Sequence, residues 1–69
     1  MQRTPVSSST VAGIGYDIAS HTLEIEFNDG RVYQYFDVPQ AIYEAFIQAS
    51  SKGVFLAQQI KGAFRYERV

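Results

Sequence analysis

The sequence lacks cysteine and tryptophan and contains a single histidine, His21. Without cysteine the 69-residue chain cannot form a disulfide, and one histidine without a thiolate is too little for a structural zinc site. A small domain that lacks both must gain its stability from close packing or from self-association. The five Tyr and five Phe residues provide material for such packing.

No apolar run approaches the roughly 18 residues that a membrane-spanning helix needs, and residues 1–5 lack the apolar core of a signal peptide. We therefore expect a cytoplasmic protein that has no membrane partner. The length predicts a single domain over residues 1–69. Residues 1–10, with Pro5 and a run of hydroxyl-bearing residues, are expected to be a flexible lead-in or to lie along a sheet edge.

The formal net charge is −1, but the two signs are unevenly distributed along the chain. Six acidic residues stand against Arg31 between Asp17 and Glu44, a balance of −5. From Lys52 to the last residue, four bases stand against Glu67, a balance of +3. This asymmetry permits an anion-facing end, although such scatter also arises by chance and four bases fall short of a basic run.

Alternation of apolar and polar residues predicts three antiparallel strands, at about residues 11–16, 22–27 and 32–37. The second strand is the clearest, because its apolar residues alternate with Glu24 and Glu26, which are expected to face water. In the first strand, Gly13 and Gly15 leave one face bare. Either another element packs closely against that face or the strand is bulged there.

The Asp29-Gly30 pair predicts a hairpin between the second and third strands, but its register stays open. A two-residue turn puts Tyr33 and Tyr35 beside the two glutamates of the second strand. A three-residue turn, with Gly30 in a bulge, shifts the pairing by one residue, so that Ile25 opposes Tyr33 and both tyrosines join the core side.

Two helices are predicted after Pro39, a residue that ends the sheet and suits the first position of a helix. The first, residues 39–50, is expected to lie on the sheet. The second, about residues 53–60, has Ser51 as its cap and turns Phe55 away from its apolar side. The apolar stripe of the first helix contains Ile42, Ala45, Phe46 and Ala49.

The predicted fold is therefore α+β. A three-stranded antiparallel meander precedes two helices that pack on one face of the sheet, and a short extended segment ends the chain.

No catalytic constellation is found in the chain. His21 lies in a predicted turn beside Ser20, but sequence neighbours seldom reach the geometry of a nucleophile and its base. Glu24 and Glu26 have a spacing that suits paired carboxylates, yet alternating glutamates are more typical of a strand's solvent face. No metal-ligand spacing, phosphate loop or nucleotide fingerprint occurs. We expect a protein that is not an enzyme and needs no cofactor.

The remaining chemical feature is a set of aromatic and basic residues in the third strand and the C-terminal segment. Aromatic rings on a sheet face can stack on exposed bases while Arg and Lys hold the backbone. The alternative is that the tyrosines are packing residues in a domain short of apolar bulk. The candidate residues for binding nucleic acid or a protein partner are Arg31, Tyr33, Tyr35, Lys61, Arg65, Tyr66 and Arg68.

Several short motifs follow one another in an informative order. They are Pro5-Val6-Ser7-Ser8-Ser9, Ile14-Gly15-Tyr16-Asp17, Thr22-Leu23-Glu24-Ile25-Glu26-Phe27, Gly30-x-Val32-Tyr33-x-Tyr35-x-x-Val38-Pro39, Ser51-Lys52-Gly53, Ile60-Lys61-Gly62 and Tyr66-Glu67-Arg68-Val69. Together they cover nearly the whole chain and resemble the KTSC domain, whose recognisable mark is Tyr-x-Tyr followed by Val-Pro. That family is named after the C-terminal extension of some lysyl-tRNA synthetases.

The resemblance implies a small bacterial domain that occurs alone or fused to a synthetase, and this short chain resembles the stand-alone members. No activity carries over, because the synthetase's catalytic machinery lies elsewhere; the fusion itself suggests RNA binding. We expect a non-enzymatic accessory domain that binds RNA weakly, for instance a tRNA-like RNA. The alternative is a protein-interaction or self-associating domain that uses the same aromatic surface. Both a monomer and a weak homodimer are compatible with the sequence.

Overall fold

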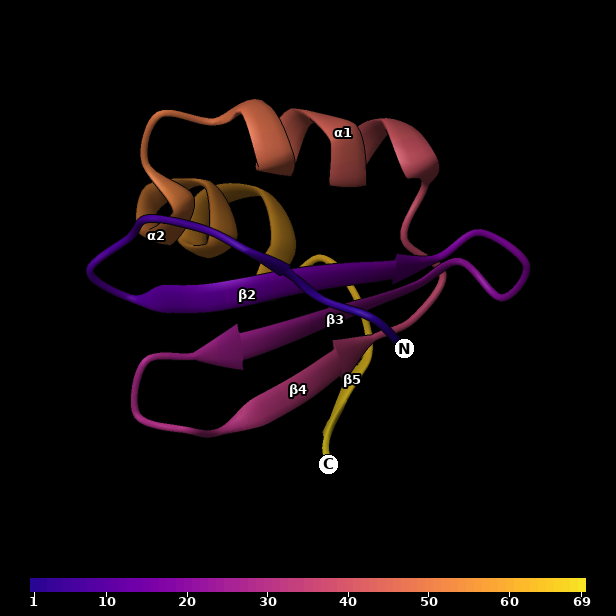
Figure 1. The fold of residues 1–69 in the computed structure, drawn as a ribbon. Helices are drawn as coiled ribbons and strands as arrows, with labels where there is room; N and C mark the ends of the chain where they lie inside the picture. The colour runs from indigo at the N-terminus through magenta and orange to yellow at the C-terminus, as the bar shows by residue number, and fades with distance from the viewer.

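The computed structural model describes residues 1–69 as one five-stranded antiparallel sheet with its helices on one face (Figure 1). The strands lie in the order of the sequence, and the helical segments separate the last strand from the other four. This arrangement confirms the predicted α+β fold. The elements are β1 (Thr4–Pro5), β2 (Val11–Asp17), β3 (Thr22–Phe27), β4 (Val32–Tyr35), α1 (Gln40–Gln48), α2 (Lys52–Phe55), the π-helix η1 (Leu56–Ile60) and β5 (Tyr66–Arg68).

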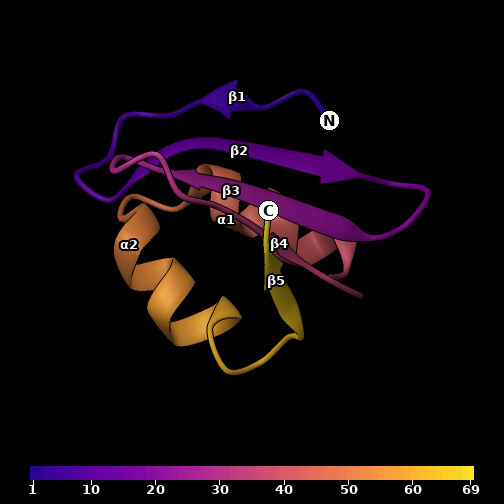
Figure 2. The same ribbon diagram turned by 90° about the horizontal axis from the view of Figure 1, so that it is seen from below.

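The sheet has two more strands than the predicted meander, and both lie at its edges (Figure 2). Within the first ten residues, Thr4 and Pro5 pair with β2, so part of the expected lead-in lies along a sheet edge. The C-terminal segment pairs with β4, where Tyr35 opposes Tyr66. No helix of this fold has the length and hydropathy needed to span a bilayer.

The hairpin between β3 and β4 adopts the register of the three-residue turn. Ile25 opposes Tyr33, and the backbone N–H of Phe27 donates to the carbonyl oxygen of Arg31 at 2.8 Å. Gly30 has a φ of 93°, which a residue with a side chain rarely adopts. Tyr33 therefore shares the helix-covered face of the sheet with Ile25. Glu24 and the residues that alternate with these two along β3 and β4 lie on the opposite face.

The core lies between the sheet and the helices. Phe46 is the fully buried residue of α1, whereas Ala45, predicted for the apolar stripe, is exposed. Tyr43, which with Ile47 widens the predicted stripe, stacks its ring on Tyr16 at 4.7 Å between centroids. The ten buried core residues are Val11, Ile14, Leu23, Ile25, Phe27, Tyr35, Val38, Phe46, Leu56 and Ile60.

The second predicted helix consists of the short α2 and a π-helical turn, and this corrects the predicted orientation of Phe55. Phe55 does not point away from the core: its ring stacks on Phe46 at 5.3 Å between centroids. The backbone N–H of Lys61 donates to the carbonyl oxygen of Leu56 at 2.8 Å, the five-residue spacing of a π-helix. Ile60 is buried in the core and Phe55 packs against that core, whereas Ala57 is exposed.

The N-terminal segment lies close to the glycine-bearing face of β2, so both alternatives weighed for that face occur. The strand is bulged between Val11 and Gly13. A Cβ atom on Gly15 would lie 2.8 Å from the carbonyl oxygen of Gln2 and 3.2 Å from the Cγ atom of Arg3. Only glycine leaves room for the segment there, because non-bonded carbon and oxygen atoms do not approach so closely.

Arg3 links this segment to Glu24, which is buried although the alternating pattern predicted that it would face water. The Arg3 guanidinium donates to Glu24 in an ion pair, and Gln34 Nε2 donates to the same carboxylate at 2.9 Å. Burial alone would raise the pKa of Glu24, but the hydrogen bonds from Gln34 and Arg3 and the charge of Arg3 outweigh it. The net effect holds the pKa of Glu24 below its ordinary value.

We expect Glu24→Gln to destabilise the protein by about 1.5–3 kcal/mol at neutral pH, the range of a hydrogen bond to a charged group. The folded-state pKa of Glu24 lies below its ordinary value of 4.5. The extra stability of wild type over Glu24→Gln is therefore fully present above pH 4.5. It is lost as the pH falls through the folded-state pKa. Urea unfolding from neutral to acidic pH tests this, with the exposed Glu44→Gln as control. A wild-type advantage that stays constant with pH would contradict the assigned ion pair.

Candidate nucleic-acid interface

A hollow of about 430 Å³ lies on the helix-covered side of the sheet, beside strands β4 and β5. The end of β3, the strand β4, the turn after η1 and the first residue of β5 supply its walls. Four of its lining residues are aromatic and two are basic. The lining residues are Phe27, Arg31, Tyr33, Tyr35, Lys61, Gly62 and Tyr66.

The aromatic rings of this hollow, hereafter the aromatic hollow, form one connected set. The Tyr66 ring lies 5.7 Å from the Tyr33 ring and 5.5 Å from the Tyr35 ring, centroid to centroid, and is tilted to both. The Phe27 and Tyr33 rings meet edge to face at 5.7 Å. Tyr66 is 55% exposed, Tyr33 is half-buried and Tyr35 is 3% exposed. Tyr66 therefore offers the accessible ring, and Tyr35 forms the floor.

The sequence leaves open whether Tyr35 is a stacking or a packing residue, and its burial makes it a packing residue. Burial, followed by the neighbouring Tyr66 and Tyr33 hydroxyls, raises the pKa of Tyr35 above its ordinary value. A ring with so little exposed surface cannot stack on a base, but it supports the rings that can. The same ring belongs to the hydrophobic core, so its loss would damage the fold as well as the hollow.

Three bases surround the aromatic hollow. Arg31 lies over the Phe27 ring, with its guanidinium carbon 5.6 Å from the ring centroid, and pairs with Asp29 at 2.8 Å. A backbone hydrogen bond from Arg31, together with its side chain, lowers the pKa of Asp29. Lys61 lines the hollow directly. Arg68 stands opposite Tyr33 in the β4–β5 ladder and so shares its face.

Arg65 lies apart from these bases, contrary to the prediction that it joins them. It precedes β5, and its guanidinium carbon lies 5.3 Å from the centroid of the Phe36 ring. Its nearest acidic partner is Asp37, at 3.9 Å and largely exposed. Five of the seven candidate residues thus line one hollow. Arg68 lies on the same face of the sheet without lining it, and Arg65 lies elsewhere.

The acidic side chains of the sheet lie on the opposite face. Glu67 pairs with Gln34 and Gln34 with Glu24, so these three residues form a row across β5, β4 and β3. Glu26 lies on the same face and contacts Arg3 at 3.3 Å. The carboxylates of these strands therefore do not repel an anion that approaches the aromatic hollow.

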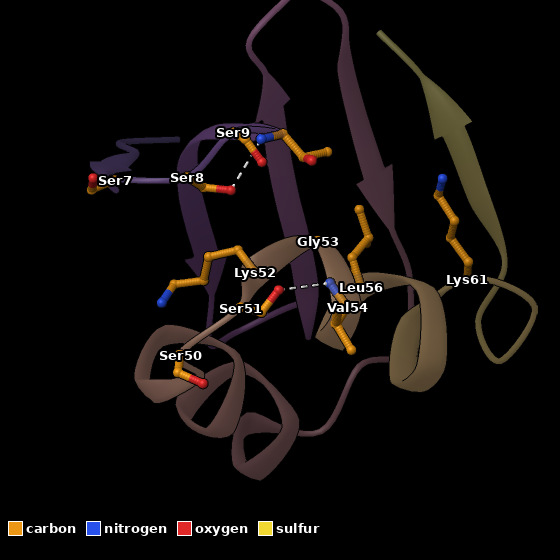
Figure 3. Close-up of a pocket in the computed structure, with 11 residues that line it drawn as sticks. Ser7, Ser8, Ser9, Ser50, Ser51, Lys52, Gly53, Val54, Leu56 and Lys61 are labelled. Atoms are coloured by element: carbon orange, nitrogen blue, oxygen red, sulfur yellow. Dashed lines mark hydrogen bonds between the residues drawn. The ribbon is translucent and has the colours of Figure 1, made fainter.

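A second hollow, of about 410 Å³, opens between the loop before β2 and the start of α2 (Figure 3). We call it the serine-lined hollow, because five serines and Thr10 contribute to its walls. The sequence predictions did not include it, since its two walls come from segments far apart in the chain. Its lining residues are Ser7, Ser8, Ser9, Thr10, Ser50, Ser51, Lys52, Gly53, Val54, Leu56 and Lys61.

The residues weighed for catalysis do not form a nucleophile–base pair. Ser20 Oγ donates to Asp17 Oδ2 at 2.8 Å, and its other close partner is the Thr22 hydroxyl, at 2.9 Å. His21 is exposed in the turn, with a φ of 56°. No group of three or more His, Asp or Glu side chains converges in a way that could hold a metal ion. The site is thus defined by aromatic surface and positive charge.

These features define a small α+β domain with a basic, aromatic hollow along one edge of an antiparallel sheet. The chain belongs to the KTSC domain family, whose family model matches residues 7–64. It is similar to the crystal structure of a KTSC domain protein from Yersinia pestis, with a TM-score of 0.93 and 45% sequence identity. That similarity covers 99% of this chain and 96% of the Yersinia chain.

Relatives of two kinds are found among known proteins. An uncharacterised protein of Stutzerimonas stutzeri is 36% identical over 70 residues, which covers all of this chain and 99% of the relative. A lysine–tRNA ligase of Trichormus variabilis is 43% identical over 54 residues, or 78% of this chain. The chain spans about a tenth of the length of that ligase, so the similarity concerns a small part of it.

Proposed function

We propose that this domain is a non-enzymatic module that binds single-stranded RNA weakly, with the aromatic hollow as its binding site. The observation that carries this proposal is the separation of charge between the two faces of the sheet. Lys61, Arg68 and the accessible Tyr66 ring lie on the helix-covered side, whereas Glu24 and Glu67 lie on the other side. Arg31 also lines the hollow, but its guanidinium is paired with Asp29. Aromatic rings bordered by bases suit an unstacked base and its phosphates.

The chemistry of each group fits this task. The exposed Tyr66 ring offers a face for a base beside a hollow of about 430 Å³. Lys61 lines the hollow and Arg68 shares the face of Tyr33, so both are placed to neutralise phosphates of a bound strand. The similar region in lysine–tRNA ligases makes tRNA a natural probe beside short single strands.

Self-association through the sheet edge is the alternative, and the structure gives it weaker support. The outer edge of β5 is free, but this strand has only three residues and carries Glu67 and Arg68. Short edge strands with charged side chains discourage edge-to-edge pairing in natural proteins. Strand β1, at the other edge, has only two residues. Sedimentation at high concentration distinguishes a monomer from a dimer.

The proposal is tested by the salt dependence of RNA binding, measured by fluorescence anisotropy with a labelled single strand. We expect binding in the micromolar range at low salt and its loss near physiological salt, because few bases contribute. Arg68→Gln should reduce the slope of log affinity against log salt by about 0.7, the value for one phosphate contact on a single strand.

Arg65→Gln is the matched control, since it removes the same charge from the same segment, but beside Phe36 and Asp37 rather than opposite Tyr33. It should leave the slope nearly unchanged. Equal slopes for both variants would show that binding depends on general charge attraction and not on the aromatic hollow. No binding of short RNA or tRNA at low salt would contradict the proposed function.

A further inference from the structure

We propose that the serine-lined hollow is a binding site for a phosphate group. Its walls bring together hydroxyl groups from two distant segments, and both lysines of the chain line it. No carboxylate is among the lining residues. A hollow in which nearly every polar side chain can donate a hydrogen bond, and two are cationic, selects an anion with several acceptor oxygens.

The two walls are held together at their base. A Cβ atom on Gly53 would lie 3.1 Å from Thr10 Oγ1, so the absence of a side chain at Gly53 lets the loop before β2 approach closely. Ser8 Oγ accepts from the backbone N–H groups of Thr10 and Val11, at 3.1 and 3.2 Å. These contacts fix the loop that carries the first group of hydroxyls.

The serines that hold the backbone keep their donor capacity. Ser51 Oγ accepts from the backbone N–H of Val54 at 3.3 Å (Figure 3), and its own hydrogen stays free to donate. The same holds for Ser8. Ser9 and Ser50 are exposed, so their hydroxyls are accessible to a ligand. The lining therefore presents donors from both walls to a group placed between them.

The two lysines differ in their surroundings. Lys52 Nζ donates to the carbonyl oxygen of Ala49 at 2.5 Å, which uses one of its three protons and orients the side chain. Lys61 lies at the side of the serine-lined hollow next to β5 and also lines the aromatic hollow (Figure 3). It is the one residue that lines both hollows, and Figure 3 shows it beside β5, apart from the serines.

Only the source of the phosphate group rests on the proposed RNA binding. Inorganic phosphate, titrated into the ¹⁵N-labelled full chain against chloride at constant ionic strength, tests the site itself. We expect saturating chemical-shift changes at residues 7–10 and 50–53. Lys61→Gln should weaken phosphate binding roughly two- to fivefold, the effect of one exposed charge pair. Arg65→Gln, outside both hollows, should not.

A short single-stranded RNA with and without a 5′-phosphate separates the sources. Shifts at both hollows that strengthen with the 5′-phosphate identify an RNA phosphate as the ligand. If inorganic phosphate produces shifts and neither RNA does, the phosphate site is supported and its ligand is a small phosphorylated molecule. The proposed RNA-binding function is then refuted. If phosphate produces no saturating shift, and Lys61→Gln equals wild type, the site is refuted even where RNA still binds the aromatic hollow.

Discussion

Phe46→Ala should leave the protein largely unfolded at room temperature. Phe46 is completely buried, and its ring stacks on Phe55, so it joins α1 to α2 as well as to the sheet. Truncation of a buried phenylalanine costs about 3–5 kcal/mol. A chain of this size buries only about 60% of its unfolded surface and has little stability in reserve. No disulfide compensates for the loss.

Circular dichroism with thermal and urea unfolding measures this effect. The control is Glu44→Ala in the same helix, where the side chain is exposed and contacts Gln40 at the surface. That variant should melt close to wild type. A melting temperature of Phe46→Ala within a few degrees of wild type would show that the contact between α1 and the sheet is assigned wrongly.

The parts of the fold that the sequence predicts are those with a repeated pattern. Strand β3 alternates cleanly along its whole length, and its predicted bounds of 22–27 agree with the structure. Pro39 marks the start of the first helix in both the prediction and the structure. The hairpin register depends on the conformation of one residue, Gly30. Its positive φ, which fits the three-residue turn, is seen only in the structure.

The parts that the sequence does not predict depend on tertiary contacts. Strands β1 and β5 have two and three residues, too few for a period to appear. The burial of Glu24 requires Arg3 to cross from an edge segment, and local alternation carries no sign of that ion pair. The segment after Phe55 is the π-helical η1, and Phe55 packs against the core together with the buried Ile60. A regular α-helical pattern therefore assigns Phe55 to the wrong side.

The candidate site shows the same division. Its residue types were visible in the sequence, because tyrosines and bases are concentrated in two segments. Which of them meet depends on β5, where alternation puts Tyr66 and Arg68 on one face and Glu67 on the other. Arg65 lies before this strand and escapes the pattern. Phe27 and Gly62 also line the hollow. Their places depend on the hairpin register and on the turn after η1, which the sequence pattern does not determine.

Tyr66→Ala should have the largest effect on RNA binding. The Tyr66 ring is the exposed one in the aromatic hollow, and the buried Tyr35 ring supports it from below. Stacking of one base on an aromatic side chain contributes about 1–3 kcal/mol, so affinity should fall roughly five- to a hundredfold. Because Tyr66 lies on an exposed edge strand, the variant should remain folded, which circular dichroism verifies. Tyr66→Phe keeps the ring and should bind nearly as well as wild type.

The affinity of wild type, Tyr66→Phe and Tyr66→Ala for one labelled single-stranded RNA at low salt is the most direct test. If the aromatic hollow binds a base, the first two affinities agree and the third is lower by at least about fivefold, the lower end of the stacking range. Equal affinities for all three folded proteins would contradict this account, because the exposed ring would then take no part in binding.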